Sequence, residues 1–234
     1  MFQTRSLQLE RIDTGDYTAQ EYEVCLSELR FINRWIGDTW ALKKTLLQEI
    51  KSRDLAEFSV LDVGAGSGEL LREIAKFARK SKQKAKLYGL ELNEMSANSI
   101  LTESEKFPEI SAVRGNVFAL PLSDKSVDYT ICSLFTHHFS DEKVVQILRE
   151  FDRISRLGIF VIDLHRHPIA YGLYKAFCAA FRISRLVSED GSLSVLRSFK
   201  PNELKSLAEK ANLENATVMR HFPFRLVLKN LLKP

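Results

Sequence analysis

Residues 60–68, Val-Leu-Asp-Val-Gly-Ala-Gly-Ser-Gly, constrain the fold of this chain more than any other stretch. Val60 to Val63 have the pattern of a short buried strand, and Glu69 opens a run with apolar residues at helical spacing. A strand, a glycine turn and a helix in this order bring the backbone of an α/β sheet against a nucleotide-like ligand. Glycines allow both a positive φ and a close approach of the ligand.

The composition is that of a globular protein, because 45% of the 234 residues are hydrophobic and 27% are charged. A net charge of +4 is too small to indicate a nucleic-acid partner, and the basic stretch 76–86 reads as the solvated end of a helix. Three separated cysteines in apolar contexts predict reduced thiols and a cytoplasmic location. No apolar signal core follows the first residue.

The chain beyond the glycine turn alternates strands with helices. Apolar runs predict strands at 86–91, 111–113, 127–134 and 157–164, helices at 93–105, 141–155 and 201–211, and two closing strands at 216–220 and 224–229. This order predicts an α/β fold: a Rossmann-like, seven-stranded, mainly parallel sheet with helices on both faces.

Two segments fall outside this alternation and divide the chain into domains. Residues 1–57 are predicted to form an N-terminal helical cap, with one helix at 19–36 and a second from an N-cap at Asp38 to Lys51. Residues 165–198 are predicted to form a helical lid between strands five and six, with a turn at Asp190-Gly191. The lid is an insertion in the main domain, residues 58–234.

An acid ends the second predicted strand. Glu91 lies 23 residues after Gly68, where a carboxylate can accept hydrogen bonds from both hydroxyls of a ribose. The alternative is a carboxylate that caps the helix beginning after Asn93.

The pattern G-x-G-x-G, with Asp62 two residues before the first glycine, resembles motif I of class I S-adenosylmethionine (SAM)-dependent methyltransferases. Residues 114–128 resemble the G-D-x-x-x-L-P-F-x-D-x-S-F-D segment of the ubiquinone/menaquinone-type enzymes, with Asn116 in place of the acid that binds the adenine amino group. The resemblance covers residues 58–163 and 201–229 and implies SAM as the cofactor. It implies these donor-binding residues: Asp62, Gly64, Ala65, Gly66, Gly68, Glu91, Leu92, Asn116, Val117, Ser133, Leu134 and, from the cap, Arg34.

A narrower resemblance concerns residues 30–37 and 163–171. They look like a bacterial subgroup found beside type III polyketide synthases, which implies a phenolic or pyrone-like acceptor.

Histidines follow strands four and five. His137 or His138 could take a proton from a phenol or enol, and the alternative is a structural cap of the loop. The acceptor is predicted to contact His165, His167, Tyr171, Tyr174 and Phe177. The spacing of these histidines is not a recognised zinc pattern, so no metal is predicted.

The lid run 169–181 is apolar on nearly all sides. It reads as a helix packed on the core or at a dimer interface, or as a substrate channel that rests on a membrane surface. The run is too short and too charged to span a bilayer.

We therefore expect SAM-dependent methyl transfer to a small, aromatic or lipophilic acceptor, with oxygen slightly favoured over carbon. An RNA methyltransferase and a non-catalytic SAM-binding accessory protein are the alternatives. The partners expected are a small-molecule acceptor and a peripheral membrane or lipid contact, without nucleic acid, for a monomer or a homodimer.

Overall fold

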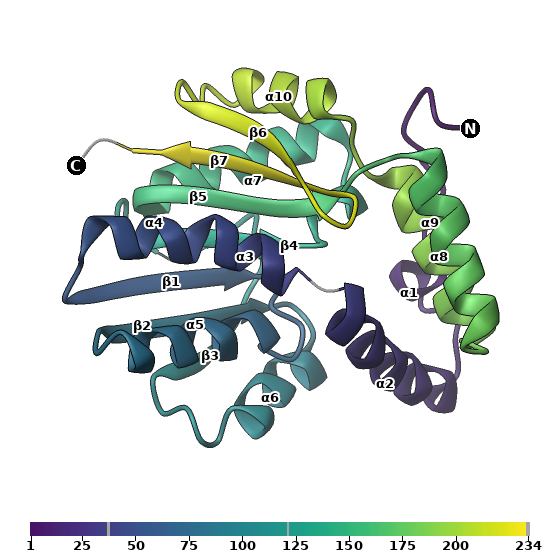
Figure 1. The fold of residues 1–234 in the computed structure, drawn as a ribbon, viewed down its shortest axis with the longest axis horizontal. Coiled ribbons are helices and arrows are strands. Elements are labelled where there is room, and N and C mark those ends of the chain that lie inside the picture. Colours follow the sequence, from purple (N-terminus) through teal and green to yellow (C-terminus); the bar gives the residue numbers. More distant parts are fainter. Residues whose placement is uncertain (37, 121, 233–234) are drawn as a thin grey trace.

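The computed structural model describes residues 1–36, 38–120 and 122–232, with all of their side chains except those of residues 26, 30 and 33–36. At its centre is one sheet of seven strands in the order β3-β2-β1-β4-β5-β7-β6 (Figure 1). The first five strands pair in parallel, and β7 runs antiparallel to both β5 and β6. The strands are β1 (Glu57–Val63), β2 (Lys84–Glu91), β3 (Ile110–Arg114), β4 (Val127–Ser133), β5 (Ser155–Leu164), β6 (Ala216–His221) and β7 (Arg225–Leu231). The predicted mainly parallel, seven-stranded sheet is confirmed.

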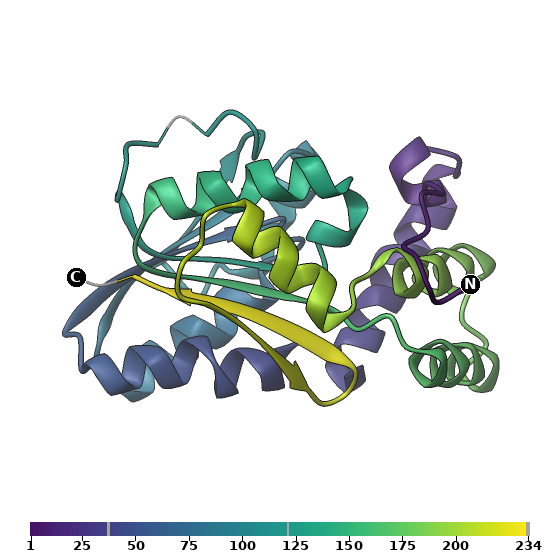
Figure 2. The same cartoon turned by 90° about the horizontal axis from the view of Figure 1, so that it is seen from above.

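Helices cover both faces of the sheet, because strand side chains alternate between the faces (Figure 2). In β1, Leu61 and Val63 pack into one buried core with α7 (Asp141–Ile154) and α10 (Pro201–Lys210). Phe58 and Val60 pack into the other core with α4 (Leu46–Arg53) and α5 (Glu69–Lys80). The helix α6 (Glu94–Glu103) contacts β2 and β3. Burial on both faces explains why these strands read as continuous apolar runs.

The predicted single helix from Asp38 to Lys51 is wrong in two respects. The chain breaks at Thr45, which separates α3 (Thr39–Lys44) from α4, and the Thr45 hydroxyl donates to the Ala41 carbonyl oxygen at 2.7 Å. Asp38 makes no side-chain cap, because its carboxylate instead accepts hydrogen bonds from Arg225 and Ser133. Both helices pack on the sheet, so this stretch belongs to the sheet core.

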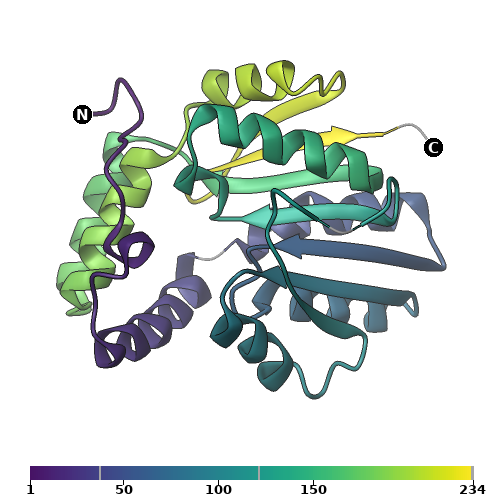
Figure 3. The same cartoon turned by 180° about the vertical axis from the view of Figure 1, so that it is seen from behind.

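A second layer of helices lies across the carboxyl ends of the strands (Figures 1 and 3). It consists of α1 (Arg11–Thr14), α2 (Ala19–Ile36), α8 (Pro168–Ala180) and α9 (Arg185–Arg197). It has a small core of its own around Cys25, Ile32, Leu186 and Val187. The covering layer therefore combines an N-terminal segment with the segment that follows β5.

The predicted turn at Asp190-Gly191 is wrong, because both residues lie inside α9. The Asp190 carboxylate accepts the backbone N–H groups of Arg11 and Ile12 at 2.9 and 3.0 Å, which fastens the start of α1. A Cβ at Gly191 would lie 2.1 Å from the Tyr174 hydroxyl oxygen. Asp and Gly are common in turns, but here Asp190 makes a long-range hydrogen bond and Gly191 allows a close contact between two helices.

Two further observations bear on the sequence predictions. All three cysteines are free and buried. None of the helices in the described ranges has the length and hydropathy needed to cross a membrane.

Candidate active site

A cavity of about 740 Å³ lies between the carboxyl edge of the sheet and the helical layer. One wall is the glycine loop after β1, together with the first turns of α5 and α6. The opposite wall is mostly apolar, with Asp190 and Ser194 of α9 as polar members, and its apolar residues are Ile12, Cys25, Leu29, Ile32, Ala170, Leu173, Tyr174, Phe177, Val187 and Val195. The volume is within the range for a site that holds a cofactor and a small molecule.

The glycine loop leaves room beside its backbone. Gly64, Gly66 and Gly68 have φ values of 70°, 57° and 80°, a region that non-glycine residues rarely adopt. A Cβ at Gly64 would lie 2.4 Å from the Phe135 ring, whereas a Cβ at Gly66 would meet nothing within 4 Å. Gly68 is the N-cap of α5 and donates its N–H to the Ala65 carbonyl at 2.8 Å. Gly64, Ala65 and Gly66, three of the residues that the resemblance assigns to the donor, line the cavity.

Asp62 lines the cavity, and one oxygen of its carboxylate lacks a hydrogen-bond partner among the described residues. Its side chain is only 2% exposed, and its Oδ1 has no hydrogen bond among the described residues. Burial, followed by the negative charges of Glu91 and Asp38, raises the pKa of this carboxyl to about 8. Such a group favours a positively charged ligand.

Glu91 stands behind the glycine loop. Its Oε1 accepts the N–H of Gly66 at 2.5 Å. Burial raises the pKa of the carboxyl, and the hydrogen bond from Gly66 partly offsets this rise. Glu91 is thus tied to the loop that it was predicted to assist, and it does not cap α6, where the Asn93 side chain accepts the N–H groups of Met95 and Ser96.

Five of the predicted donor contacts lie outside the cavity lining: Gly68, Glu91, Leu92, Asn116 and Val117. Leu92 is 67% exposed, Val117 is buried in the sheet core, and the exposed Asn116 uses its Oδ1 to accept the Phe118 N–H at 3.0 Å. Ser133 and Leu134 do line the cavity. The side chain of Arg34 lies outside the described residues.

The short helix η1 (Thr136–His138) presents His137 to the cavity. His137 Nδ1 lies 2.7 Å from Asp163 Oδ1, while Asp163 Oδ2 accepts the Thr136 hydroxyl at 2.6 Å and the His137 N–H at 3.1 Å. Burial opposes ionisation of Asp163, but His137 and these hydrogen bonds outweigh it and lower the pKa to about 2. An ionised Asp163 can only accept, so Nδ1–H donates to it, and in the uncharged form of the ring Nε2 is the acceptor.

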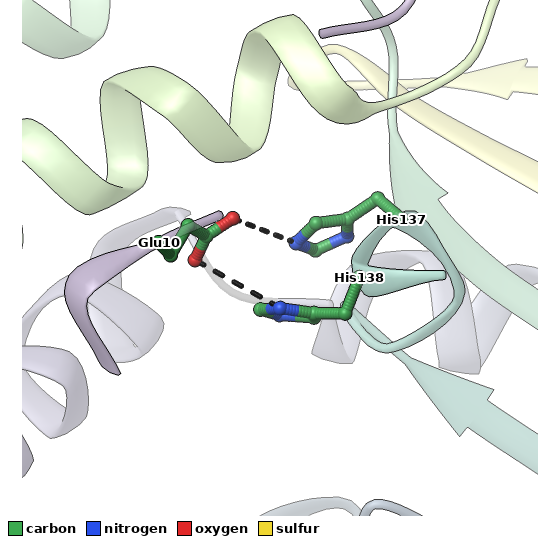
Figure 4. A group of neighbouring side chains, drawn as sticks. All are labelled: Glu10, His137 and His138. Atoms are coloured by element: carbon green, nitrogen blue, oxygen red, sulfur yellow. Dashed lines mark ion pairs between the residues drawn. The ribbon is translucent and has the colours of Figure 1, made fainter. Parts of the chain in front are cut away.

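Glu10 faces the two histidines from the N-terminal segment (Figure 4). Its Oε1 lies 3.9 Å from His137 Nε2, and its Oε2 lies 4.0 Å from His138 Nδ1. Ser194 in α9 donates its hydroxyl to Glu10 Oε1 at 2.9 Å. Burial raises the pKa of Glu10 to about 7, against the lowering effects of His138, Ser194 and Arg197.

Glu10 was not predicted from the sequence to be a site residue. The residue belongs to no motif, and it precedes His137 by 127 positions in the sequence. The signal available was one acid between apolar Leu9 and the start of a helix.

The spacing of this cluster favours proton acceptance over metal binding. The ligand atoms of Glu10, His137 and His138 lie within 4.8 Å of one another. Zinc bonds of about 2.0–2.1 Å would hold ligand atoms about 3.4 Å apart in a tetrahedron. The two printed separations from Glu10 exceed that, and His138 Nδ1 already lies 3.0 Å from Asp13 Oδ1. The absence of a metal stays a prediction.

Of the predicted acceptor contacts, Tyr174 and Phe177 line the cavity, whereas His165, His167 and Tyr171 do not. His167 caps α8, because its Nδ1 accepts the Ile169 N–H at 3.2 Å, and its ring stacks on Phe224. Burial and then nearby positive charges, Arg220 first, lower the pKa of His165 to about 4.

Comparison with known proteins agrees with this geometry. The family described as a methyltransferase domain matches residues 60–158. A demethylmenaquinone methyltransferase of Bacillus mycoides is 23% identical over 241 residues, which cover 96% of each chain. An uncharacterised methyltransferase-like protein of Schizosaccharomyces pombe is 25% identical over 150 residues, which cover 64% of this chain. This chain spans about half of that relative, 49% of its length.

The fold is also found among solved structures. The crystal structure of a SAM-dependent methyltransferase from Aquifex aeolicus matches with a TM-score of 0.57 and 18% identity, over 80% of this chain and 88% of the other. The predicted methyltransferase fold is thereby confirmed, and the matching family agrees with the prediction of a methyltransferase, whereas the polyketide-associated subgroup stays a prediction. Residues 60–158 thus match the methyltransferase-domain family and lie in a sheet that has the fold of the SAM-dependent methyltransferases.

Proposed function

We propose that this chain methylates an oxygen atom of a small, aromatic or lipophilic acceptor. The observation that carries the proposal is the single cavity that joins the glycine loop, the Asp163-bound His137 and an apolar wall. An acceptor related to quinones, phenols or pyrones suits this wall. The relationship to the demethylmenaquinone methyltransferase supports a quinone-like class.

The residues along the sheet edge fit SAM. The buried, unpartnered Oδ1 of Asp62 suits a cation, and SAM carries an ammonium and a sulfonium. The open space at Gly66 admits a ligand against the backbone, and Glu91 stands next to it to accept ribose hydroxyls. We assign Asp62 to the amino-acid end of SAM and Glu91 to the ribose. When bound, SAM supplies an electrophilic methyl group on a positively charged sulfur.

His137 is the proposed general base. Its Nδ1–H is held by Asp163, so Nε2 faces the cavity and accepts the proton of an acceptor hydroxyl, which leaves the oxygen as the nucleophile. Glu10, 3.9 Å from Nε2, then stabilises the positive imidazolium. Asp163 and Glu10 thus act through His137, from opposite sides of its ring.

The apolar wall aligns the acceptor and excludes water, which is the main contribution a protein makes to a displacement at an activated methyl group. Phe177 stacks with Phe31 at 6.1 Å between ring centroids, so the wall joins α8 to α2. Enclosure by two helical segments favours a small molecule over a nucleic acid. The buried free thiols favour a reducing compartment, the cytoplasm.

The test is incubation of the purified chain with methyl-labelled SAM and separate pools of small molecules, lipids and RNA. We expect label in an organic-soluble acceptor, and no label with His137→Asn. Label in RNA would contradict the acceptor class. SAM binding without transfer to any pool would contradict the proposed activity and favour an accessory protein.

A further inference from the structure

The helix α8 leaves one apolar face uncovered at the periphery of the molecule. Its main helical neighbour is α9, and it stands well away from the sheet (Figures 1 and 2). Ile169 and Leu173 are 57% and 58% exposed, and Ala176 and Ala180 continue the exposed row. These positions follow one another at spacings of four, three and four residues, so they share one helix face. Phe181, directly after the helix, is 54% exposed.

The charged residues within the segment that contains this face are of one sign. Residues 164–188 contain no Asp or Glu, but they contain one Lys and three Arg. Lys175 and Arg182 are exposed, and among the described residues neither has a carboxylate within ion-pair distance. Arg166 and Arg185 do have one, in Glu203 and Glu189. An apolar helix face beside unneutralised cations complements an anionic lipid surface.

The same helix forms part of the cavity wall. Ala170, Leu173 and Phe177 line the cavity from α8. Leu173 is at once more than half exposed and part of this lining, so it stands at the mouth. Leu29 and Phe222, which are 37% and 76% exposed, line the cavity as well. The mouth is therefore apolar and lies beside the uncovered face.

From this juxtaposition we infer that α8 docks the chain on an anionic membrane surface, with the cavity mouth toward the lipid. A lipophilic acceptor dissolved in the bilayer then reaches the cavity past Leu173 without crossing water. The docking is independent of the chemistry, whereas the supply of an acceptor rests on the proposed methyl transfer.

The test is cosedimentation of the full chain with two kinds of vesicles. One kind is phosphatidylcholine alone, and the other contains about 30 mol% phosphatidylglycerol, an anionic lipid that gives the surface a negative potential. We expect binding to the anionic vesicles at least about tenfold stronger than to the neutral ones. The binding should weaken in high salt, because the Debye length falls to about 3 Å at 1 M.

Two variants locate the contact. Ile169→Glu combined with Ala176→Glu places two acids on the exposed face without touching the cavity lining, and we expect at least about tenfold weaker vesicle binding. Leu101→Glu is the matched control, because Leu101 is a 49% exposed leucine on α6. It should bind as the unmodified chain does. Retained SAM affinity in each variant shows that the fold is intact.

Several outcomes would overturn the inference: no binding of the unmodified chain to anionic vesicles, equal binding to neutral ones, or an equal loss with Leu101→Glu. A dimer in sedimentation equilibrium that dissociates with the double variant would also overturn it, because α8 would then be an interface between two copies. If the unmodified chain does not bind SAM, the proposed function is contradicted, but the docking result still stands.

Discussion

The two walls of the cavity are built in different ways. The donor wall comes mainly from one stretch, within residues 62–70, with further residues from α6. The acceptor wall comes from two pairs of helices, α1 with α2 and α8 with α9; the pairs are more than 130 residues apart in sequence and meet through side chains. Backbone conformation shapes the first wall, and packing shapes the second. Substitutions in the two walls should therefore separate SAM binding from acceptor methylation.

The largest effect is expected where the two walls meet. His137→Asn should lower methyl transfer by about 10²–10⁴-fold, the usual contribution of a general base, because Asn can still donate to Asp163 but offers no ring nitrogen. SAM affinity should stay within about twofold in the same variant. Turnover with labelled SAM and binding calorimetry measure the two quantities. His138→Asn is the control, and full activity of His137→Asn would contradict the assignment.

A charge in the acceptor wall should come next. Phe177→Asp should lower turnover of a lipophilic acceptor by about hundredfold, because a carboxylate placed among apolar groups costs several kcal/mol. SAM affinity should not change, since no donor contact is lost. Phe177→Leu keeps the wall apolar and should retain most of the activity. Unchanged turnover with Phe177→Asp would show that the acceptor binds elsewhere.

Substitutions in the donor wall should have the opposite signature. Gly66→Val adds a side chain at φ 57° on the cavity surface, where a non-glycine residue costs about 1–2 kcal/mol. We expect SAM affinity to fall at least about tenfold in Gly66→Val and, as a separate variant, in Glu91→Ala. Gly172→Val is the matched control, because this α8 glycine also has open space around it but no positive φ. Near-normal SAM affinity in both donor-wall variants would refute the assignment.

The pH dependence of SAM binding should follow Asp62. Its folded pKa of about 8 lies above the unfolded value of 3.8, so at pH 7 the free protein carries mostly the protonated carboxyl. Because the anion binds the cationic donor, affinity should rise about fivefold from pH 7 to 8 and level off above about pH 9. Without SAM, the free energy of unfolding should fall as pH rises from about 4 to 8.

Calorimetry in buffers of different ionisation enthalpy provides a second measure of the same linkage. Most of a proton should be released when SAM binds at pH 7. Asp62→Asn should remove both the release and the slope, which distinguishes Asp62 from Glu10, the other carboxyl that titrates near neutrality. A slope that persists in Asp62→Asn would assign the linkage to another group.

The smallest effect is expected at the tie between α1 and α9. Asp190→Asn leaves one acceptor oxygen for the two N–H groups of Arg11 and Ile12, which should cost about 1 kcal/mol in the free energy of unfolding. Urea denaturation measures this quantity. Glu189→Gln, next to it but on the surface, should change it by less than about 0.5 kcal/mol. Equal effects would show that α9 carries no long-range constraint at this position.

Local patterns predicted the sheet and marked the glycine loop that lines the cavity. The strands are short runs of apolar residues buried on both faces, and the positive φ values of the loop after β1 fall on glycines, so both can be read from neighbours in the sequence. Glu91 was found because it ends a strand, and Asp62 because it lies two residues before the first glycine. Leu92, Asn116 and Val117 were assigned by resemblance, and the structure places them, together with Gly68 and Glu91, outside the cavity lining.

The acceptor wall was predicted only in outline. The spacing of apolar residues predicted a helical lid between β5 and β6. It did not predict which of the lid's side chains face the cavity. His165 and His167 follow a strand end, yet the backbone after β5 runs beside β7, where His167 stacks on Phe224 and caps α8. Asp190-Gly191 looks like a turn until the contacts with α1 and Tyr174 are known.

The stretch 60–68 was enough to predict a strand, a turn with positive φ and a ligand at the sheet edge, because these properties depend on residues within a few positions of one another. The environment of His137 depends on Glu10, 127 positions earlier, and on Asp163, 26 positions later. No local pattern encodes such pairings, since they arise when separate elements pack over the same strand ends. The chemistry proposed for the cavity is therefore a property of the folded chain, built on a donor wall that the glycine motif encodes locally.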